Sequence, residues 1–286
     1  MKARPLFFTT VALTAFAANS LLCRMALGES AMDAASFSTV RLASGAATLL
    51  LIFRLSPRQR TATAAGDWLS ATMLFSYMVT FSFAYISLSA GTGALILFGM
   101  VQATMLLWAL RTGERPHLME WGGLTLALGG LVYLVFPGLA APSPGGASLM
   151  AVAGISWGVY SLRGRGSHRA LADTTFNFMR ALPLALVVSL VALRHSHLSL
   201  RGILLASLSG ALASGLGYTC WYAALRHLTA TRAAVVQLTV PVLAALGGIV
   251  FLAEEVSLRL ALSMALILGG VALATAAHRQ PVPVKV

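Results

Sequence analysis

Charged residues are scarce in this chain of 286 residues. Asp, Glu, Lys and Arg make up 10% of it, whereas hydrophobic residues make up 58%. A soluble domain carries about 25% charged residues and buries its apolar side chains in one core. This chain has far more apolar surface than such a core could hold. The composition therefore excludes a soluble globular protein and makes the lipid bilayer the expected solvent.

Acidic and histidine side chains are scarcer still. The chain has eight Asp and Glu and six His, all in predicted loops or near predicted helix ends. A membrane metalloprotease needs clustered His and acidic ligands, and Mg²⁺-dependent prenyl transfer needs Asp-rich sites. The sequence contains neither cluster, no Walker motif for ATP hydrolysis, and no Ser or Cys with a His base at a recognisable spacing. An enzyme is therefore disfavoured, and no metal or other cofactor is expected.

Cysteine is nearly absent. The two cysteines, Cys23 and Cys220, both fall in predicted apolar segments. They form no disulfide framework and no metal-binding spacing, so we interpret them as small apolar packing residues.

Long apolar runs are what the chain has in abundance. Because a helix rises 1.5 Å per residue, about 20 apolar residues cross the hydrocarbon core. Such runs are predicted at residues 5–27, 35–54, 68–88, 92–111, 118–137, 147–164, 174–193, 202–225, 232–252 and 258–277. The first is too long for the apolar region of a cleaved signal peptide, so we interpret it as a permanent span. The sequence thus predicts an all-α integral membrane protein with ten transmembrane helices.

The second half of the chain repeats the first at a nearly constant offset. Residues 90–101 align with 230–241, Arg41 with Arg180, Glu114 with Glu254, and Gly129-Gly130 with Gly269-Gly270. The halves, residues 1–140 and 141–286, hold five predicted spans each. An odd number of spans forces the second copy to enter the bilayer upside down. The pattern predicts two inverted five-helix repeats, an arrangement typical of carriers that work by alternating access.

The excess of basic residues predicts the orientation in the membrane. If the N-terminus is cytoplasmic, the inner segments hold most of the twenty Lys and Arg, namely Lys2, Arg4, Arg54, Arg58, Arg60, Arg111, Arg115, Arg163, Arg165, Arg169, Arg226, Arg232, Arg279 and Lys285. The positive-inside rule then places both termini in the cytoplasm of a multi-pass protein of the inner (plasma) membrane. Contact with anionic lipid head groups follows from the same charges. No nucleic-acid partner is expected.

The residues after the third predicted span resemble a known family. The stretch SLSAGTGALILFGMVQ (87–102), followed by RTGERPHLMEWGGLTLALGGLVYLV (111–135), resembles the second part of the repeat in EamA-type carriers of the drug/metabolite transporter (DMT) superfamily. That family places a Gly-Glu-Arg turn, here Gly113-Glu114-Arg115, before a last helix with a Gly-Gly pair. The second copy keeps the family's helix proline as Pro241, whereas the first has Val101 at the equivalent position.

The resemblance covers nearly the whole chain and implies export of small metabolites. The chain looks most like the YddG-type aromatic amino acid exporters, so the substrate implied is an aromatic or other neutral amino acid. Exporters of drugs, cations or nucleobases in the same superfamily are the alternative. A membrane-embedded enzyme and a scaffold protein without a translocation path are further alternatives from other classes.

A central substrate cavity is predicted from aromatic and polar residues inside the spans. Tyr77, Phe81 and Tyr85 follow one another at i, i+4 and i+8, on one stripe of a helix. The predicted lining is Asn19, Ser20, Tyr77, Thr80, Phe81, Phe98, Gln102, Trp157, Tyr160, Tyr218, Trp221 and Gln237. For any single aromatic residue, packing or anchoring at the membrane interface is the alternative. Gln102 and Gln237 should face other helices or water, because burying an amide in lipid is costly.

Two arginines inside predicted spans suggest gates. Arg41 and Arg180 occupy matching places in the two repeats, where an arginine costs at least about 2.5 kcal/mol on insertion scales. They could simply extend to the nearer head groups. The hypothesis is that each closes one end of the cavity by an ion pair, Arg41 on the side of Glu254 and Arg180 on the side of Glu114.

Energy coupling and assembly are only partly constrained. Carriers driven by protons or sodium commonly use a carboxylate inside the membrane. Its absence favours facilitated transport, or coupling through groups near the loops. Pro241 should bend its helix more than Val101 bends the matching one. The helices at 118–137 and 258–277 are expected at the periphery or at a dimer contact, so the protein is expected to be a monomer or a homodimer.

Overall fold

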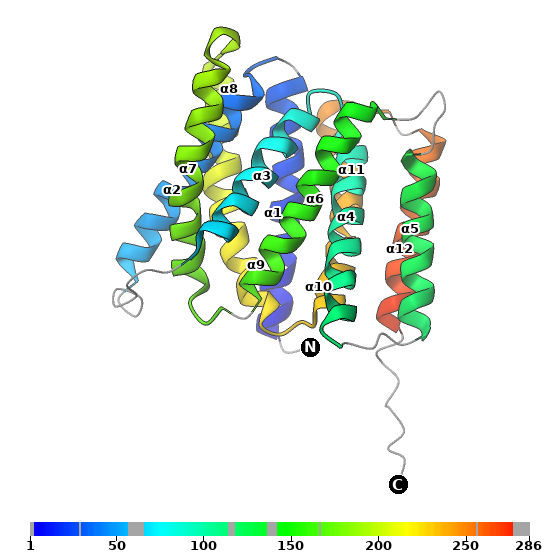
Figure 1. Cartoon of the computed structure of the whole chain (residues 1–286). Helices are drawn as coiled ribbons and strands as arrows, with labels where there is room; N and C mark the ends of the chain where they lie inside the picture. The colour runs from blue at the N-terminus through cyan, green and yellow to red at the C-terminus, as the bar shows by residue number, and fades with distance from the viewer. Residues whose placement is uncertain are drawn as a thin grey trace.

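The chain folds into a bundle of helices (Figure 1). The computed structural model describes residues 3–28, 30–56, 66–113, 118–135, 142–165, 167–255 and 257–276. The first half contains α1 (Ala3–Gly28), α2 (Ala34–Leu55), α3 (Trp68–Ala84), α4 (Ala90–Arg111) and α5 (Leu118–Val135). The second contains α6 (Pro144–Gly164), α7 (Ala170–Val191), η2 (Leu193–His195), α8 (Leu200–Leu208), η3 (Ser209–Leu216), α9 (Gly217–Leu225), α10 (Ala230–Gln237), α11 (Val240–Leu252) and α12 (Leu258–Ala276).

Within the part of the chain that the structure describes, the predicted apolar runs fall on helices whose ends differ by a few residues, except that the run at 232–252 is divided into α10 and α11. Short polar residues define several of these ends. The side chains of Asp33, Asp67, Ser89, Ser143 and Ser199 each accept a hydrogen bond from the backbone N–H three residues later. This is N-capping, which satisfies a backbone donor that has no partner within the helix.

The surface of the bundle is apolar. Among the described residues, six helical stretches are long and apolar enough to cross a membrane: Pro5–Gly28, Ala34–Leu55, Ala90–Arg111, Pro144–Gly164, Ala170–Val191 and Leu200–Leu225. Trp68–Ala84, Val240–Leu252 and Leu258–Gly270 are shorter apolar helices. Large apolar side chains such as Val191, Val250 and Leu204 point outward. A multi-pass membrane protein explains this surface, because lipid rather than water surrounds it.

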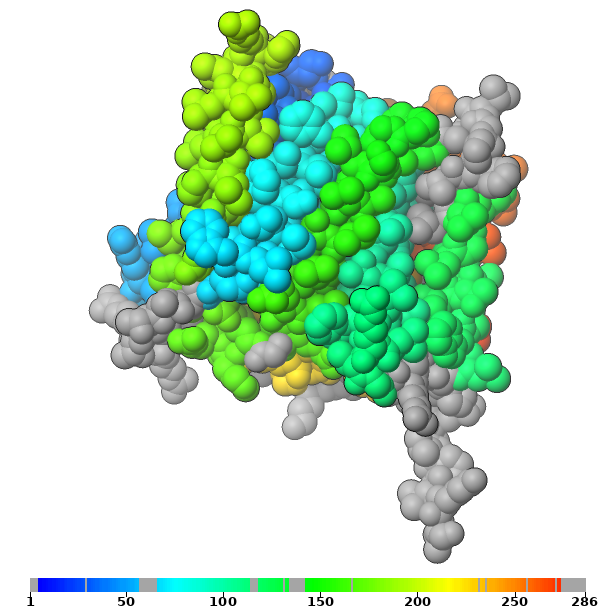
Figure 2. Space-filling model, viewed as in Figure 1, coloured from blue at the N-terminus to red at the C-terminus, as the bar shows by residue number. Residues whose placement is uncertain are grey.

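The helices pack in pairs around a common centre. α3 lies against α6, α2 against α7, and α4 against both α6 and α11. Figure 2 shows α3 and α6 crossing the viewed face side by side. α5 and α12 pair closely with each other and stand at one side of the bundle (Figure 1).

Two stretches depart from regular α-helix. Residues 209–216, between α8 and α9, form a π-helical segment, η3, so the stretch from 200 to 225 is helical throughout. α10 and α11 are separated at Leu238 and Thr239, just before Pro241, which has no N–H to donate to the carbonyl of Gln237. The matching Val101 lies inside the uninterrupted α4. The helical stretch with the proline is thus interrupted, whereas the stretch with Val101 is continuous.

Candidate functional site

Aromatic rings from five helices, α1, α3, α4, α6 and α9, meet at the centre of the bundle. Phe16 of α1 lies in the middle, with its ring centroid 5.2 Å from that of Trp157, 5.9 Å from Tyr218, 5.6 Å from Trp221 and 6.3 Å from Phe98. None of these five side chains is more than 5% exposed. We call these five residues, together with Tyr77 and Phe81, the aromatic centre. A buried wall of rings is what an apolar or aromatic ligand requires.

α3 contributes the predicted stripe to this centre. Tyr77 and Phe81 lie 5.4 Å apart, and Phe81 and Tyr85 lie 4.7 Å apart. The Tyr77 ring is 5.0 Å from that of Trp157, and its hydroxyl accepts a hydrogen bond from the Tyr218 hydroxyl at 3.3 Å. All three α3 side chains are buried.

Arg41 of α2 reaches the same centre and is completely buried. Its Nε donates to the Ser214 hydroxyl at 3.0 Å, and its Nη2 donates to the hydroxyls of Tyr77 at 3.2 Å and Tyr218 at 2.9 Å. The guanidinium carbon also lies 4.9 Å from the Phe81 ring centroid, a cation–π distance. Its Nη1 has no hydrogen-bond partner among the residues that the structure describes.

The π-helical segment η3 places two serines toward α1. The Ser209 hydroxyl donates to Asn19 Oδ1 at 2.7 Å, and the Ser214 hydroxyl is 3.4 Å from the same atom. These serines are five residues apart, a spacing that a π-helix closes with its i→i+5 bonds. Because Ser214 also accepts from Arg41, the segment joins α1 to α2 through one buried polar network.

Two glutamines lie at the edge of the aromatic centre. The Trp157 indole N–H donates to Gln237 Oε1 at 2.9 Å, and Gln237 Nε2 donates to the Ala233 carbonyl at 3.1 Å. Gln102 follows Phe98 by one turn of α4 and is 4% exposed. Its Oε1 has no partner in the described part of the chain, so it is free to accept a hydrogen bond.

Tyrosines lead from the aromatic centre toward the end of the bundle where α1 begins. The Tyr160 ring lies 5.7 Å from that of Trp157, and the Tyr222 hydroxyl donates to the Tyr160 carbonyl at 3.3 Å. Tyr222 in turn borders a largely polar cavity of about 240 Å³. The cavity is lined by Gly66, Asp67, Ser70, Arg163, Gly164, Arg169, Asp173, Asn177 and Tyr222. At its edge Arg163 forms an ion pair of 3.1 Å with Asp67.

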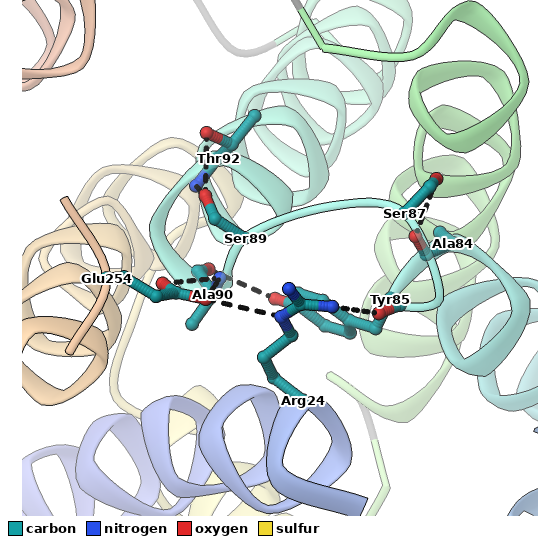
Figure 3. A network of polar contacts seen from close by, with 8 residues as sticks. All are labelled: Arg24, Ala84, Tyr85, Ser87, Ser89, Ala90, Thr92 and Glu254. Carbon is teal, nitrogen blue, oxygen red and sulfur yellow. Dashed lines mark hydrogen bonds and ion pairs between the residues drawn. The ribbon is translucent and has the colours of Figure 1, made fainter. Parts of the chain in front are cut away.

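The opposite end of the bundle is held together by an ion pair between the two halves of the chain. Arg24 of α1 lies 3.3 Å from Glu254, which follows α11, and donates to the Tyr85 carbonyl at 3.1 Å (Figure 3). The Glu254 carboxylate also accepts from the Ala90 N–H at 3.0 Å. We call this arrangement the Arg24–Glu254 network. It links α1, the α3–α4 turn and the end of α11.

The structure separates some residues that the sequence placed together. Thr80 is only half-buried, and its hydroxyl donates to the Ser76 carbonyl of its own helix at 2.7 Å, away from the aromatic centre. Ser20 is buried. Arg41 does not pair with Glu254, because the carboxylate lies at the end of the bundle beside Arg24 while the guanidinium lies among the tyrosines.

The second hypothetical gate is described only in part. Arg180 is half-buried near the polar cavity, close to Gly66 and Asn177. Glu114, its expected partner, lies outside the described residues.

Sequence reasoning missed Phe16 and Arg24. A Phe in a span looks like ordinary packing, and Arg24 looks like a loop cation. The signal that could have found Phe16 is the repeat, because it aligns with Trp157 at an offset of 141 and the two rings touch. Tyr77 and Tyr218 are separated by the same 141 positions and also touch.

A multi-pass helical bundle with rings, amides and a guanidinium buried at its centre has the architecture of a membrane carrier. Residues 144–276 match the model of the EamA-like transporter family. Uncharacterized protein PA1977 of Pseudomonas aeruginosa is 51% identical over 271 residues, which cover 94% of each chain. The chain belongs to the EamA-like transporter family and is a membrane transporter.

A solved crystal structure has the same fold. It aligns with a TM-score of 0.67 and 22% identity, over 94% of this chain and 99% of its own. At that identity the likeness concerns the fold alone.

Proposed function

We propose that this protein is a facilitative or secondary carrier that exports small metabolites, foremost aromatic and other neutral amino acids. The observation that carries the proposal is the aromatic centre, in which the rings of Phe16, Trp157 and Tyr218 contact one another. The Arg41 guanidinium is hydrogen-bonded to Tyr218, and the Gln237 amide to Trp157. Rings can hold an apolar side chain, and the polar atoms can fix a charged or hydrogen-bonding backbone group.

The proposed mechanism is alternating access between two inverted five-helix repeats, residues 1–140 and 141–286, that together span the membrane ten times. The helix pairing supports this division. α2 packs on its counterpart α7, and α5 packs on its counterpart α12. α3 packs on α6, and their counterparts in the other half, α8 with α9 and α1, pack on each other in the same way. A two-fold relation between inverted repeats requires such matching contacts.

We propose that gates at the two ends of the bundle open in turn. The Arg24–Glu254 network joins the first repeat to the second at one end. In the alignment of the repeats, Arg24 matches Arg165 and Glu254 matches Glu114. The second gate is therefore assigned to Arg165 and Glu114, with Arg180 beside it. This proposal replaces Arg41 by Arg24 as the arginine that acts at the Glu254 gate.

Orientation and coupling follow from charge. The basic residues support an inner-membrane location with both termini cytoplasmic. The described acidic residues lie at or beyond helix ends, which supports facilitated transport because a coupling carboxylate is commonly found within the spans.

Uptake into proteoliposomes tests the proposal. The panel holds radiolabelled phenylalanine, tryptophan and leucine, an organic cation drug and a nucleobase. We expect saturable uptake of the amino acids, reduced at least about tenfold by Trp157→Ala, which removes the ring that contacts Phe16 and Tyr218. Flux confined to the drug or the nucleobase would assign a different substrate class. Absence of flux for every compound would overturn the proposed amino acid carrier.

A further inference from the structure

Arg41 carries a positive charge into the centre of the bundle without a described counter-charge. Its hydrogen-bond partners are the hydroxyls of Ser214, Tyr77 and Tyr218, all of them neutral. The ion pairs found among the described residues, Arg24 with Glu254 and Arg163 with Asp67, lie at the ends of the helices. A buried charge is usually paired, since desolvation is otherwise costly.

The guanidinium keeps one nitrogen free. Nε and Nη2 are used by the three hydroxyls, whereas Nη1 is buried without a partner among the described residues. Arginine presents its N–H groups as a planar fork that matches the two oxygens of a carboxylate. The three hydroxyls and the Phe81 ring fix the orientation of the fork, so the free nitrogen is already positioned for an incoming anion.

We propose that Arg41 binds the anionic group of the transported molecule, a carboxylate in the first instance, through Nη1. The inference rests on the proposed function and narrows it, because the substrate must carry an anionic group beside an apolar or aromatic body. The body lies against the aromatic centre. Organic cations without a carboxylate should bind more weakly, because the charge of Arg41 repels them.

The contrasting role for Arg41 is purely structural, in which it only joins α2 to Tyr77, Tyr218 and Ser214. That role predicts loss of stability when Arg41 is replaced but no preference among ligands by charge. Ligand charge therefore separates the two roles.

The test measures binding of a panel of ligands to the purified protein in lipid nanodiscs. Intrinsic tryptophan fluorescence and isothermal titration calorimetry detect the binding. The ligands are phenylalanine, 3-phenylpropionate, which has the carboxylate alone, and phenethylamine, which has the ammonium group alone. We expect phenylalanine and 3-phenylpropionate to bind and phenethylamine to bind about ten- to a hundredfold more weakly, since a charged hydrogen bond is lost. Binding of phenethylamine as tight as that of 3-phenylpropionate would overturn the inference on the wild-type protein alone.

Variants of Arg41 test whether carboxylate binding depends on this residue. Arg41→Gln should weaken binding of both carboxylates about ten- to a hundredfold, whereas binding of phenethylamine should not weaken, because the like charge that repels it is removed. Arg41→Lys, which keeps the charge but not the planar fork of N–H groups, should retain part of the carboxylate binding. Arg111→Gln is the matched control, because Arg111 is an exposed arginine at the end of α4. Unchanged carboxylate binding by Arg41→Gln would contradict the inference.

The anion site at Arg41 and the proposed amino acid transport can fail independently in these experiments. Binding of 3-phenylpropionate that depends on Arg41, without transport of any amino acid, supports the anion site and overturns the amino acid substrate. If Arg41→Gln transports phenylalanine with an unchanged half-saturation concentration, the anion site is contradicted, whereas the proposed amino acid carrier is supported.

Discussion

At the scale of single residues, the aromatic centre depends on buried polar atoms that satisfy one another. The indole N–H of Trp157 has its acceptor in Gln237 Oε1, and neither side chain is more than 1% exposed. Removing one partner leaves the other without a hydrogen bond in a place that water does not reach, which costs more than removing both.

Gln237→Leu should therefore lower the free energy of unfolding by about 1–3 kcal/mol, because Trp157 is left with an unsatisfied donor. Thermal unfolding in detergent measures the change. The control is the pair Trp157→Phe and Trp157→Phe/Gln237→Leu, since phenylalanine has no N–H to satisfy. If Gln237→Leu costs as much with phenylalanine at position 157 as it does in the wild type, the hydrogen bond is not the cause.

Asp67 offers a test of charge at a helix end. Partial burial raises the pKa of its carboxyl, but hydrogen bonds from Ser70 and from the Arg163 guanidinium outweigh this and hold the pKa below its usual value. A lowered pKa means that the ionised form stabilises the folded protein. That stabilisation is complete above about pH 4 and disappears as the pH falls through the lowered pKa.

We expect Asp67→Ala to lower the stability at pH 7 by about 1 kcal/mol, because α3 loses its N-cap. Asp67→Asn should cost less, since its amide oxygen can still cap the helix. Thermal unfolding between pH 3 and pH 7 checks this. The difference between the wild type and Asp67→Asn should shrink as the pH falls, and a difference that grows toward acid would refute the assignment.

At the scale of helices, close approach between α2 and η3 positions Arg41. Gly210 permits this approach, because a Cβ at that position would lie 2.1 Å from the Arg41 carbonyl oxygen and 2.0 Å from the Ser44 hydroxyl. Those distances are far below contact, so α2 would have to move. The position of Arg41 among the tyrosines thus depends on a glycine in another helix.

Gly210→Ala should destabilise the protein by about 1–3 kcal/mol through overpacking and weaken substrate binding. Gly215→Ala is the matched control in the same π-helical segment, where the nearest atom to the added Cβ would be 3.4 Å away. Thermal unfolding and ligand titration of both variants measure the contrast. Equal effects of the two substitutions would show that backbone propensity, rather than the approach of α2, is responsible.

The helices themselves could be predicted closely from the sequence, whereas the directions of side chains could not. Hydropathy and span length predicted the apolar runs, and Pro241 predicted a departure from regular helix near the break between α10 and α11. The π-helical segment has no marker in its composition, so the turn that aligns Ser209 with Ser214 was not foreseen. Without that alignment, Arg41 was assigned to a gate at one end of the cavity rather than to the centre of the bundle.

The candidate site was predictable where residues lie on one helical stripe. Tyr77 and Phe81 are four residues apart and therefore share a face, and the structure buries both. Thr80 lies between them in sequence but is only half-buried, and its hydroxyl donates to the Ser76 carbonyl of its own helix. The partner of Glu254 depends on how α1 meets α11, which no local pattern encodes.

At the scale of the whole molecule, the Arg24–Glu254 network joins the first half of the chain to the second. In alternating access this end must open, so the two side chains should act as a unit. We expect Arg24→Gln and Glu254→Gln each to lower stability, and the double variant to cost less than the sum, with a coupling energy of about 0.5–3 kcal/mol. Thermal unfolding of the four proteins gives this energy. Strict additivity would show that the pair does not hold the end closed.

The central claim is that the buried centre of the bundle is the path of the substrate, and thiol accessibility tests it most directly. Gln102→Cys is placed in a background of Cys23→Ala and Cys220→Ala, and a membrane-impermeant thiol reagent is added from either side of the membrane. Leu186→Cys is the control, because Leu186 lies on the outer surface of α7. The account predicts labelling of position 102 from both sides, slowed by phenylalanine, and none at position 186. A position 102 that stays unlabelled from both sides would contradict it and indicate a packed scaffold.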